Sequence, residues 1–230
     1  MTDVKNAVIG SYRLVRTNRR TLSITLDRDG VVTAHAPLKM PQWQIERFLA
    51  EKSGWIEQKR KVVQSRKNQA VRYQVTRGGR LPYLGGEILV EFYSVKKPEL
   101  SGQTLYLPNQ GDPVKHALKW FRIQAETQLT PLVHQWAQRT NIHPTKISFG
   151  HAATRWGSMN SQGEMRLNIA LMHCPPAYIH YVVVHELAHR LHMNHSPAFH
   201  ACVEKFYPGA SKIRQQGKAF AGYLQLLREK

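Results

Sequence analysis

Four residues in the last quarter of the sequence have the types and spacing of a metal centre: His185, Glu186, His189 and, six residues further on, His195. On a helix, residues four apart share a face about one turn apart, so the imidazoles of His185 and His189 can bind one ion. Glu186 is rotated by about 100° from His185, which places its carboxylate beside the ion rather than on it. A carboxylate in that place can take a proton from a water that the metal polarises. The pattern H-E-x-x-H therefore predicts metal-dependent hydrolysis with Glu186 as general base.

A catalytic zinc site has three protein ligands and keeps a fourth position open. On a continuous helix, His192 would lie about 10 Å along the axis from His185, too far to share an ion whose ligand atoms are about 2 Å away. His195 can reach the ion if the helix ends near Asn194 in a left-handed cap and Ser196-Pro197 starts a new helix. The sequence therefore predicts one Zn²⁺ per chain, bound by His185, His189 and His195.

The same stretch resembles a known family. His185-Glu186-Leu187-Ala188-His189, followed by His195-Ser196-Pro197-Ala198-Phe199, is similar to the YgjP-like metallopeptidases, relatives of the SprT/Spartan and Wss-type zinc metalloproteases. Thr154-Arg155-Trp156-Gly157-Ser158 also matches, as do short segments of the N-terminal half, so the resemblance covers nearly the whole chain. Met159 and His200 stand where the family usually has Cys and Trp. The resemblance implies peptidase activity and gives His195 as the third zinc ligand.

The segment from Thr154 to Ser158 is predicted to form a strand near the metal helix. In zincins, a sheet edge beside the metal site binds extended peptide as an added strand. Arg155, Trp156 and Ser158 are therefore the predicted substrate-binding residues, although Trp156 also fits a position in the core. A tetrahedral intermediate also needs a hydrogen-bond donor for its oxyanion, and Arg155, Ser158, His192 and Tyr207 remain open for this role.

The surrounding pattern supplies the elements that these residues need. Apolar residues recur at helical spacing from Val114 to about Thr140, and Pro175-Pro176 leads into the metal helix. A long helix, a small antiparallel sheet and an H-E-x-x-H helix, in that order, are typical of a compact zincin-like domain. Strands are predicted at residues 146–149, 154–159 and 164–168, and further helices at 197–205 and 210–228.

The N-terminal half is predicted to be a β-rich domain with one helix. Residues 12–36 alternate between apolar and polar, and Asp29-Gly30 indicates a hairpin. The sequence from Asn109 to Pro113 combines turn residues with a helix start, so a domain boundary is expected there. The fold class is α+β, with domains at residues 1–111 and 112–230. The helix is predicted at residues 42–64, a surface loop at 96–103, and further strands at 73–77, 80–84, 88–93 and 104–107.

Composition restricts the compartment and the partners. The chain has 230 residues, 42% of them apolar, and two cysteines. Because they form no C-x-x-C pair, and no signal peptide or long apolar run is found, we expect a cytoplasmic protein without membrane association. The net charge of +18 favours attraction to polyanions, including nucleic acid, although a solvated basic surface is equally consistent with it. Its densest cluster is Lys59-Arg60-Lys61 with Arg66-Lys67.

Three functions follow from these features. The first is a zinc metallopeptidase that acts on peptide or protein substrates, as the resemblance implies. The second keeps the metal and hydrolyses nucleotide phosphoanhydrides, to which a basic surface would contribute. The third is a nucleic-acid-associated protein that acts on DNA-bound proteins. The residues alone indicate a metal-dependent hydrolase, and they do not choose its substrate.

Overall fold

The computed structural model describes residues 2–27 and 29–228, except for the side chains of residues 2, 3, 65–67 and 69–71. The protein is of the α+β class, as the sequence predicts. It divides into two compact units, Met1–Asn68 and Gln69–Lys230. The sequence places its boundary between residues 111 and 112 instead. The two divisions differ because the strands between residues 80 and 108 bury their apolar side chains in one core with the long helix that follows them.

The smaller unit contains a four-stranded sheet and the helices that follow it. The strands lie in the order β1-β2-β4-β3, in which β2 and β4 are parallel and the outer pairs are antiparallel. One helix was expected after the sheet, but α1 ends at Glu51, and α2 begins at Ser53 after the capping residue Lys52. The break lets Ile45, Leu49 and Ile56 enter the same core. The elements are β1 (Thr2–Ala7), β2 (Gly10–Thr17), β3 (Ser23–Leu26), β4 (Val32–Pro37), α1 (Gln42–Glu51) and α2 (Ser53–Arg72).

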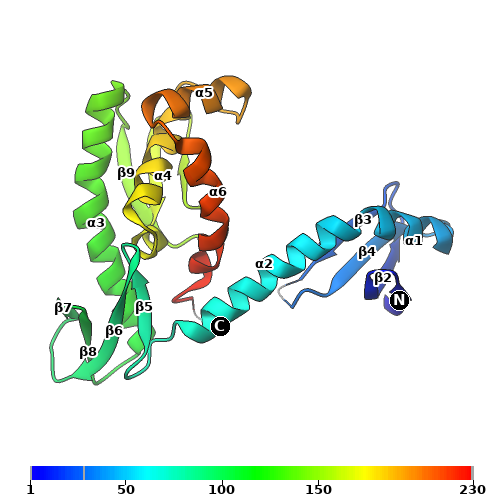
Figure 1. Ribbon diagram of the computed structural model, residues 1–230, viewed down its shortest axis with the longest axis horizontal. Coiled ribbons are helices and arrows are strands. Elements are labelled where there is room, and N and C mark those ends of the chain that lie inside the picture. Colours follow the sequence, from blue (N-terminus) through cyan, green and yellow to red (C-terminus); the bar gives the residue numbers. More distant parts are fainter. Residues whose placement is uncertain (1, 28, 229–230) are drawn as a thin grey trace. The chain divides into compact units, whose positions relative to one another are not determined.

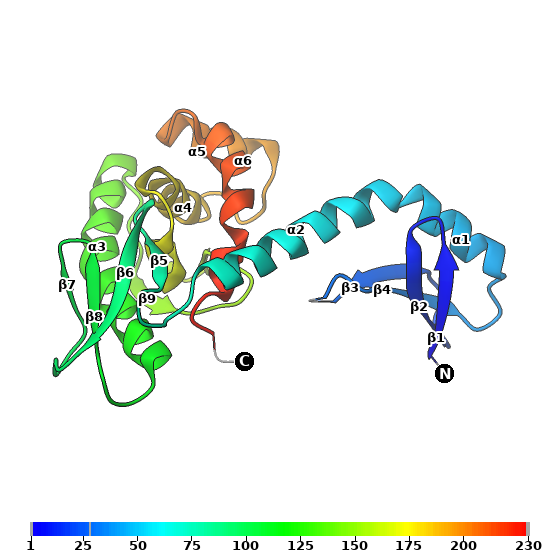
Figure 2. The same ribbon diagram turned by 60° about the horizontal axis from the view of Figure 1, so that its bottom comes forward.

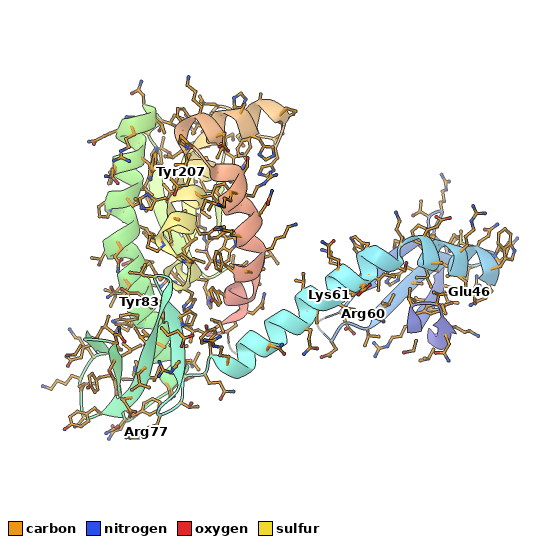
Figure 3. All side chains as sticks on the ribbon, in the orientation of Figure 1. Glu46, Arg60, Lys61, Arg77, Tyr83 and Tyr207 are labelled. Atoms are coloured by element: carbon orange, nitrogen blue, oxygen red, sulfur yellow. The ribbon has the colours of Figure 1, made fainter. Side chains whose placement is uncertain are left out.

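The basic cluster at residues 59–67 lies within α2, and several of its side chains contact other residues of the protein. Arg60 donates a hydrogen bond to the carbonyl of Ile9 at 2.8 Å, and Lys61 forms an ion pair with Glu57 at 3.0 Å (Figure 3). The ammonium of Lys59 lies 5.7 Å from the ring centre of Trp55. The side chains of Arg66 and Lys67, which complete the cluster in the sequence, lie outside the described residues.

The larger unit begins with a second four-stranded sheet, whose order is β5-β6-β8-β7 with β6 and β8 parallel. Its buried side chains share a core with α3, which runs from Pro113 to Thr140. Figure 2 shows this sheet beside the helix. Asp112 caps this helix by accepting a hydrogen bond from the Val114 amide at 2.8 Å, and Asn141 ends it in the left-handed conformation. Residues 73–77 are irregular rather than a strand, and β7 lies in the expected loop. The strands are β5 (Arg80–Tyr83), β6 (Gly86–Tyr93), β7 (Glu99–Ser101) and β8 (Thr104–Pro108).

A third sheet lies next to α3 and has the order β10-β11-β9. It is mixed rather than antiparallel, because β9 and β11 are parallel while β10 and β11 are antiparallel. The segment between β9 and β10 reverses the direction of the chain, and the turn between β10 and β11 reverses it again. β10 is shorter than predicted because Asn168 donates hydrogen bonds to the carbonyls of Ala152 and Arg155, which holds that segment as a loop. The strands are β9 (Lys146–Gly150), β10 (Gly157–Met159) and β11 (Glu164–Asn168).

The remaining helices complete the larger unit. Helix α4 packs against both α3 and α6, and Figure 1 shows it between them. The final helix was predicted to extend to residue 228, but α6 ends at Phe220 and a short 3₁₀ helix follows. None of the helices that the structure describes is long and apolar enough to cross a membrane. The elements are η1 (Ile169–His173), α4 (Pro176–Ala188), α5 (Pro197–Phe206), α6 (Ala210–Phe220) and η2 (Ala221–Gln225).

Candidate metal centre

The H-E-x-x-H segment forms the end of α4. Pro176 occupies the first helical position, where the missing amide hydrogen is not needed. Val182, Val183 and Val184 would weaken an isolated helix because their side chains are branched at Cβ. In the protein all three are almost fully buried, so packing stabilises the helix despite this low propensity.

Helix α4 ends at Ala188, six residues before the predicted end near Asn194. The amides of Arg190 and Leu191 bond to the carbonyls three residues earlier, so the chain tightens and leaves the helix direction. Asn194 does not adopt a left-handed conformation. Because α4 ends early, the residues after Ala188 turn back towards the helix. The sequence predicts this turn further along the chain, near Asn194.

The structure brings His185, His189 and His195 together. One nitrogen of each ring lies within 4.8 Å of the others, and the Nε2 atoms of His185 and His195 are 3.1 Å apart. His195 precedes α5, whose cap is Ser196, with Pro197 at the first helical position, as predicted. The serine hydroxyl accepts a hydrogen bond from the Phe199 amide at 3.3 Å, which fixes the direction in which α5 starts.

Phe199 forms an apolar support for the three imidazoles. Its side chain is fully buried, and its ring centre lies 4.8 Å, 4.6 Å and 4.9 Å from those of His185, His189 and His195. A single aromatic ring therefore packs against all three histidines, which restricts their orientations.

The Nδ1 atoms of His185 and His189 also have partners. Nδ1 of His185 lies 3.3 Å from the Tyr181 hydroxyl, and Nδ1 of His189 donates a hydrogen bond to the carbonyl of His192 at 3.0 Å. Such partners orient a metal-binding imidazole and fix which nitrogen is free. Burial lowers the pKa of His185 to about 3, and burial also lowers that of His189. Neutral rings whose free nitrogens converge fit Zn²⁺.

Glu186 lies beside the three histidines and is almost fully buried. Burial raises its pKa to about 8, while the charge of Arg155 opposes the rise. The strand β10 approaches this side chain closely at Gly157. A Cβ atom at residue 157 would lie 2.7 Å from both Cγ and Oε1 of Glu186, so only glycine leaves room for the carboxylate there.

A cavity of about 440 Å³ opens onto the histidines and Glu186. The three residues predicted to bind substrate, Arg155, Trp156 and Ser158, all line it. Of the residues left open as oxyanion donors, His192 and Tyr207 do not line it, and the Tyr207 hydroxyl donates to the carbonyl of Ala177 at 3.2 Å.

Two lining residues, Tyr178 and Tyr181, were not predicted. Tyr178 packs against Trp156 with ring centres 5.6 Å apart, and Tyr181 contacts His185. Their signal was present in the sequence, because Tyr178, Tyr181 and His185 follow one another at helical spacings of three and four.

Comparisons with known proteins complete the description of the site. The sequence matches a family described as YgjP-like, metallopeptidase domain, over residues 20–219, which include the three histidines and Glu186. No curated protein matches the chain. Among solved structures, one that is similar is the crystal structure of the metallopeptidase zymogen of Pyrococcus abyssi abylysin. The similarity has 21% sequence identity and a TM-score of 0.36, and covers 39% of this chain and 90% of that chain.

Proposed function

The chain belongs to the YgjP-like metallopeptidase family, and on that premise we propose that it is a zinc enzyme in which Glu186 is the general base for peptide-bond hydrolysis. The observation that carries the proposal is the convergence of His185, His189 and His195, whose free nitrogens lie within 4.8 Å of one another. Zinc bound by these residues would act as a Lewis acid that polarises water and the substrate carbonyl.

Glu186 performs the proton transfers in this proposal. Its carboxylate accepts a proton from the attacking water and then gives it to the departing amine. Burial raises the pKa of Glu186, so its carboxylate is a stronger base than an exposed carboxylate. Gly157 supports this role, because its missing side chain is what lets Glu186 lie against β10.

The substrate is proposed to bind along β10. Among the described strands, β10 pairs only with β11, so its other edge has unpaired backbone groups. An extended peptide can add to such an edge as a further strand. Arg155, Trp156 and Ser158 lie on or next to β10 and line the cavity at the histidines, so we propose that they contact the bound peptide.

The test replaces the carboxylate of Glu186 by an amide of the same shape, which cannot act as a base. Glu186→Gln should retain one zinc per chain and the wild-type fold, while peptide hydrolysis falls by about two to four orders of magnitude. Glu126→Gln removes an exposed carboxylate from α3 that does not line the cavity, and it should keep the wild-type rate. Hydrolysis is followed by mass spectrometry of peptide products, with a nucleoside triphosphate assayed in parallel. A Glu186→Gln variant that cleaves peptide at the wild-type rate would show that another group activates the water.

A further inference from the structure

A second cavity of about 320 Å³ lies at the same edge strand and shares Arg155, Trp156, Gly157 and Ser158 with the first. The strand register separates the two faces of the sheet. Gly157 is paired with Leu167 and Ser158 with Arg166, so the side chains of Ser158 and Arg166 share a face. Because Gly157 faces Glu186, the face that carries Ser158 and Arg166 is the one turned away from the metal centre.

The second cavity is positively charged. Arg155 and Arg166 line it, and its described lining contains no carboxylate. Neither arginine forms an ion pair with any described residue, although Arg155 acts on Glu186 from a greater distance. Two further arginines lie nearby, since Arg228 donates a hydrogen bond to the carbonyl of His151, which lines the cavity, at 2.8 Å, and Arg122 donates one to the carbonyl of Phe149 at 3.3 Å.

The walls of this cavity are held in place by buried and backbone groups. Asn168, which is 3% exposed, donates hydrogen bonds of 2.8 Å to the carbonyls of Ala152 and Arg155. His151 donates to the carbonyl of Leu226 at 3.1 Å. The guanidinium of Arg166 lies over Gly150, where a Cβ atom would be 2.5 Å from its Nε. The glycine therefore makes room for the cation.

We propose that this second cavity is a subsite for an acidic side chain of the substrate, whose carboxylate is bound by Arg166 with Arg155 beside it. The inference rests on the proposed peptidase function. A peptide strand added to β10 directs alternate side chains to opposite faces of the sheet. One set would enter the metal cavity, and the next residue along would reach the cavity of Arg166. An arginine without an ionic partner binds a carboxylate through two parallel hydrogen bonds.

The position of the cavity favours a peptide over a nucleotide. In a phosphoanhydride, neighbouring phosphates are joined through a single oxygen. A nucleotide hydrolysed at the histidines would keep its phosphates together on the face of the sheet that carries the metal centre. Arg166 lies on the other face, towards which an extended peptide directs its next side chain.

The test uses peptide pairs that differ only in Glu or Gln at one position, with that position moved along both sides of the scissile bond. We expect the wild-type zinc enzyme to have a kcat/KM about tenfold higher for Glu than for Gln at one position, or at positions two apart. Arg166→Gln should bring the ratio close to one, and Arg166→Lys should keep part of it. Lys146→Gln is the matched control, because it removes an exposed charge from the same sheet outside both cavities. It should retain the wild-type ratio.

A second variant shifts the guanidinium of Arg166 without changing the charge of the cavity. Gly150→Ala crowds the guanidinium of Arg166 and should lower the Glu-to-Gln ratio while both arginines remain. A binding measurement makes the test independent of turnover. The zinc-loaded Glu186→Gln protein should bind the Glu peptide about tenfold more tightly than the Gln peptide by calorimetry, and adding Arg166→Gln should abolish the difference.

The outcomes separate the two proposals. Peptide cleavage without a Glu preference would overturn the subsite and leave the peptidase proposal intact. If no peptide is cleaved, the peptidase proposal fails, and the calorimetric comparison still decides the subsite. Equal binding of the Glu and Gln peptides, or a Glu preference that survives Arg166→Gln, overturns it.

Discussion

Single residues decide which histidines converge at the candidate metal centre. His192 is closer in sequence to His189 than His195 is, and the early end of α4 removes the distance argument that excluded it. The structure nevertheless uses only the backbone of His192, whose carbonyl accepts a hydrogen bond from Nδ1 of His189. His195 instead turns its ring towards His185 and Phe199. The same short segment thus contributes one backbone group and one ring.

This difference predicts the metal content of two variants. His195→Ala removes one of the three converging nitrogens and should lower zinc occupancy sharply after dialysis, because two ligands remain. His192→Ala keeps its carbonyl and should bind nearly one zinc per chain. Metal content is measured by elemental mass spectrometry on protein confirmed to be folded by circular dichroism. The assignment is wrong if His192→Ala empties the site while His195→Ala remains loaded.

At the scale of elements, the close approach of β10 to α4 brings the proposed substrate-binding edge next to Glu186, the proposed general base. The contact is made through a glycine, and the backbone of Gly157 is not in the left-handed region. A substitution there therefore acts through space alone. The cost falls on Glu186, whose carboxylate and Cγ occupy the place of the new methyl group.

Gly157→Ala should therefore reduce peptide hydrolysis by about a hundredfold, the order expected for a catalytic group displaced by about 1 Å. Zinc content should be retained, because the three atoms nearest to a Cβ at this position all belong to Glu186 and none to a histidine. Gly54→Ala is the control, since a Cβ atom at Gly54 meets nothing within 4 Å. The measurement is kcat/KM with zinc content determined on the same samples. Wild-type activity in Gly157→Ala would mean that Glu186 moves without consequence.

The sequence predicted the elements whose ends depend on local chemistry. Asp112-Pro113 and Ser196-Pro197 start α3 and α5 because a capping side chain and a proline act within one turn. The end of α4 was missed because its last turn is tightened by bonds in the returning segment, including the one from His189 to His192. The parallel pairing of β9 with β11 was missed because alternation gives a strand's faces and not its direction.

At the scale of the whole molecule, one buried histidine connects the larger unit's core to acid stability. His173 is 2% exposed, donates a hydrogen bond from Nδ1 to the carbonyl of Pro82 at 2.8 Å, and packs against Phe121. Burial lowers its pKa from 6.5 to about 4. Between these values the unfolded chain binds a proton that the folded protein does not, so this contribution to stability is present above pH 6.5 and is lost as the pH falls towards 4.

His173→Asn should therefore flatten the dependence of stability on pH. Asn retains a donor for the Pro82 carbonyl and does not titrate. Between pH 7.5 and 5, the wild type should lose about 2 kcal/mol more unfolding free energy than the variant. Urea unfolding of the metal-free proteins at both values measures the difference, and the other histidines contribute to both proteins alike. Equal losses would show that His173 is not held neutral by burial.

The charge of the whole chain gives a separate prediction. A net charge of +18 should produce binding to duplex DNA that is independent of sequence and weakens steeply with salt. Lys59→Gln with Lys61→Gln should reduce the slope of log K against log salt by at most about two, since each phosphate contact contributes about 0.9. A salt titration by fluorescence anisotropy measures both slopes. A dissociation constant above about 100 µM near physiological salt would show that the basic surface is solvated and does not serve nucleic-acid binding.

The two four-stranded sheets have the same topology. Their orders, β1-β2-β4-β3 and β5-β6-β8-β7, correspond strand by strand, and in both the central pair is parallel. Each consists of two hairpins joined by a single pairing of strands that are distant in sequence. Hairpins form in about 1–10 µs, whereas a ribosome adds roughly 5–20 residues per second. The last strand of the second sheet ends at Pro108, 77 residues before His185. About 4 to 15 s of translation therefore separate Pro108 from His185 at that speed, so both sheets have time to pair before His185 leaves the ribosome.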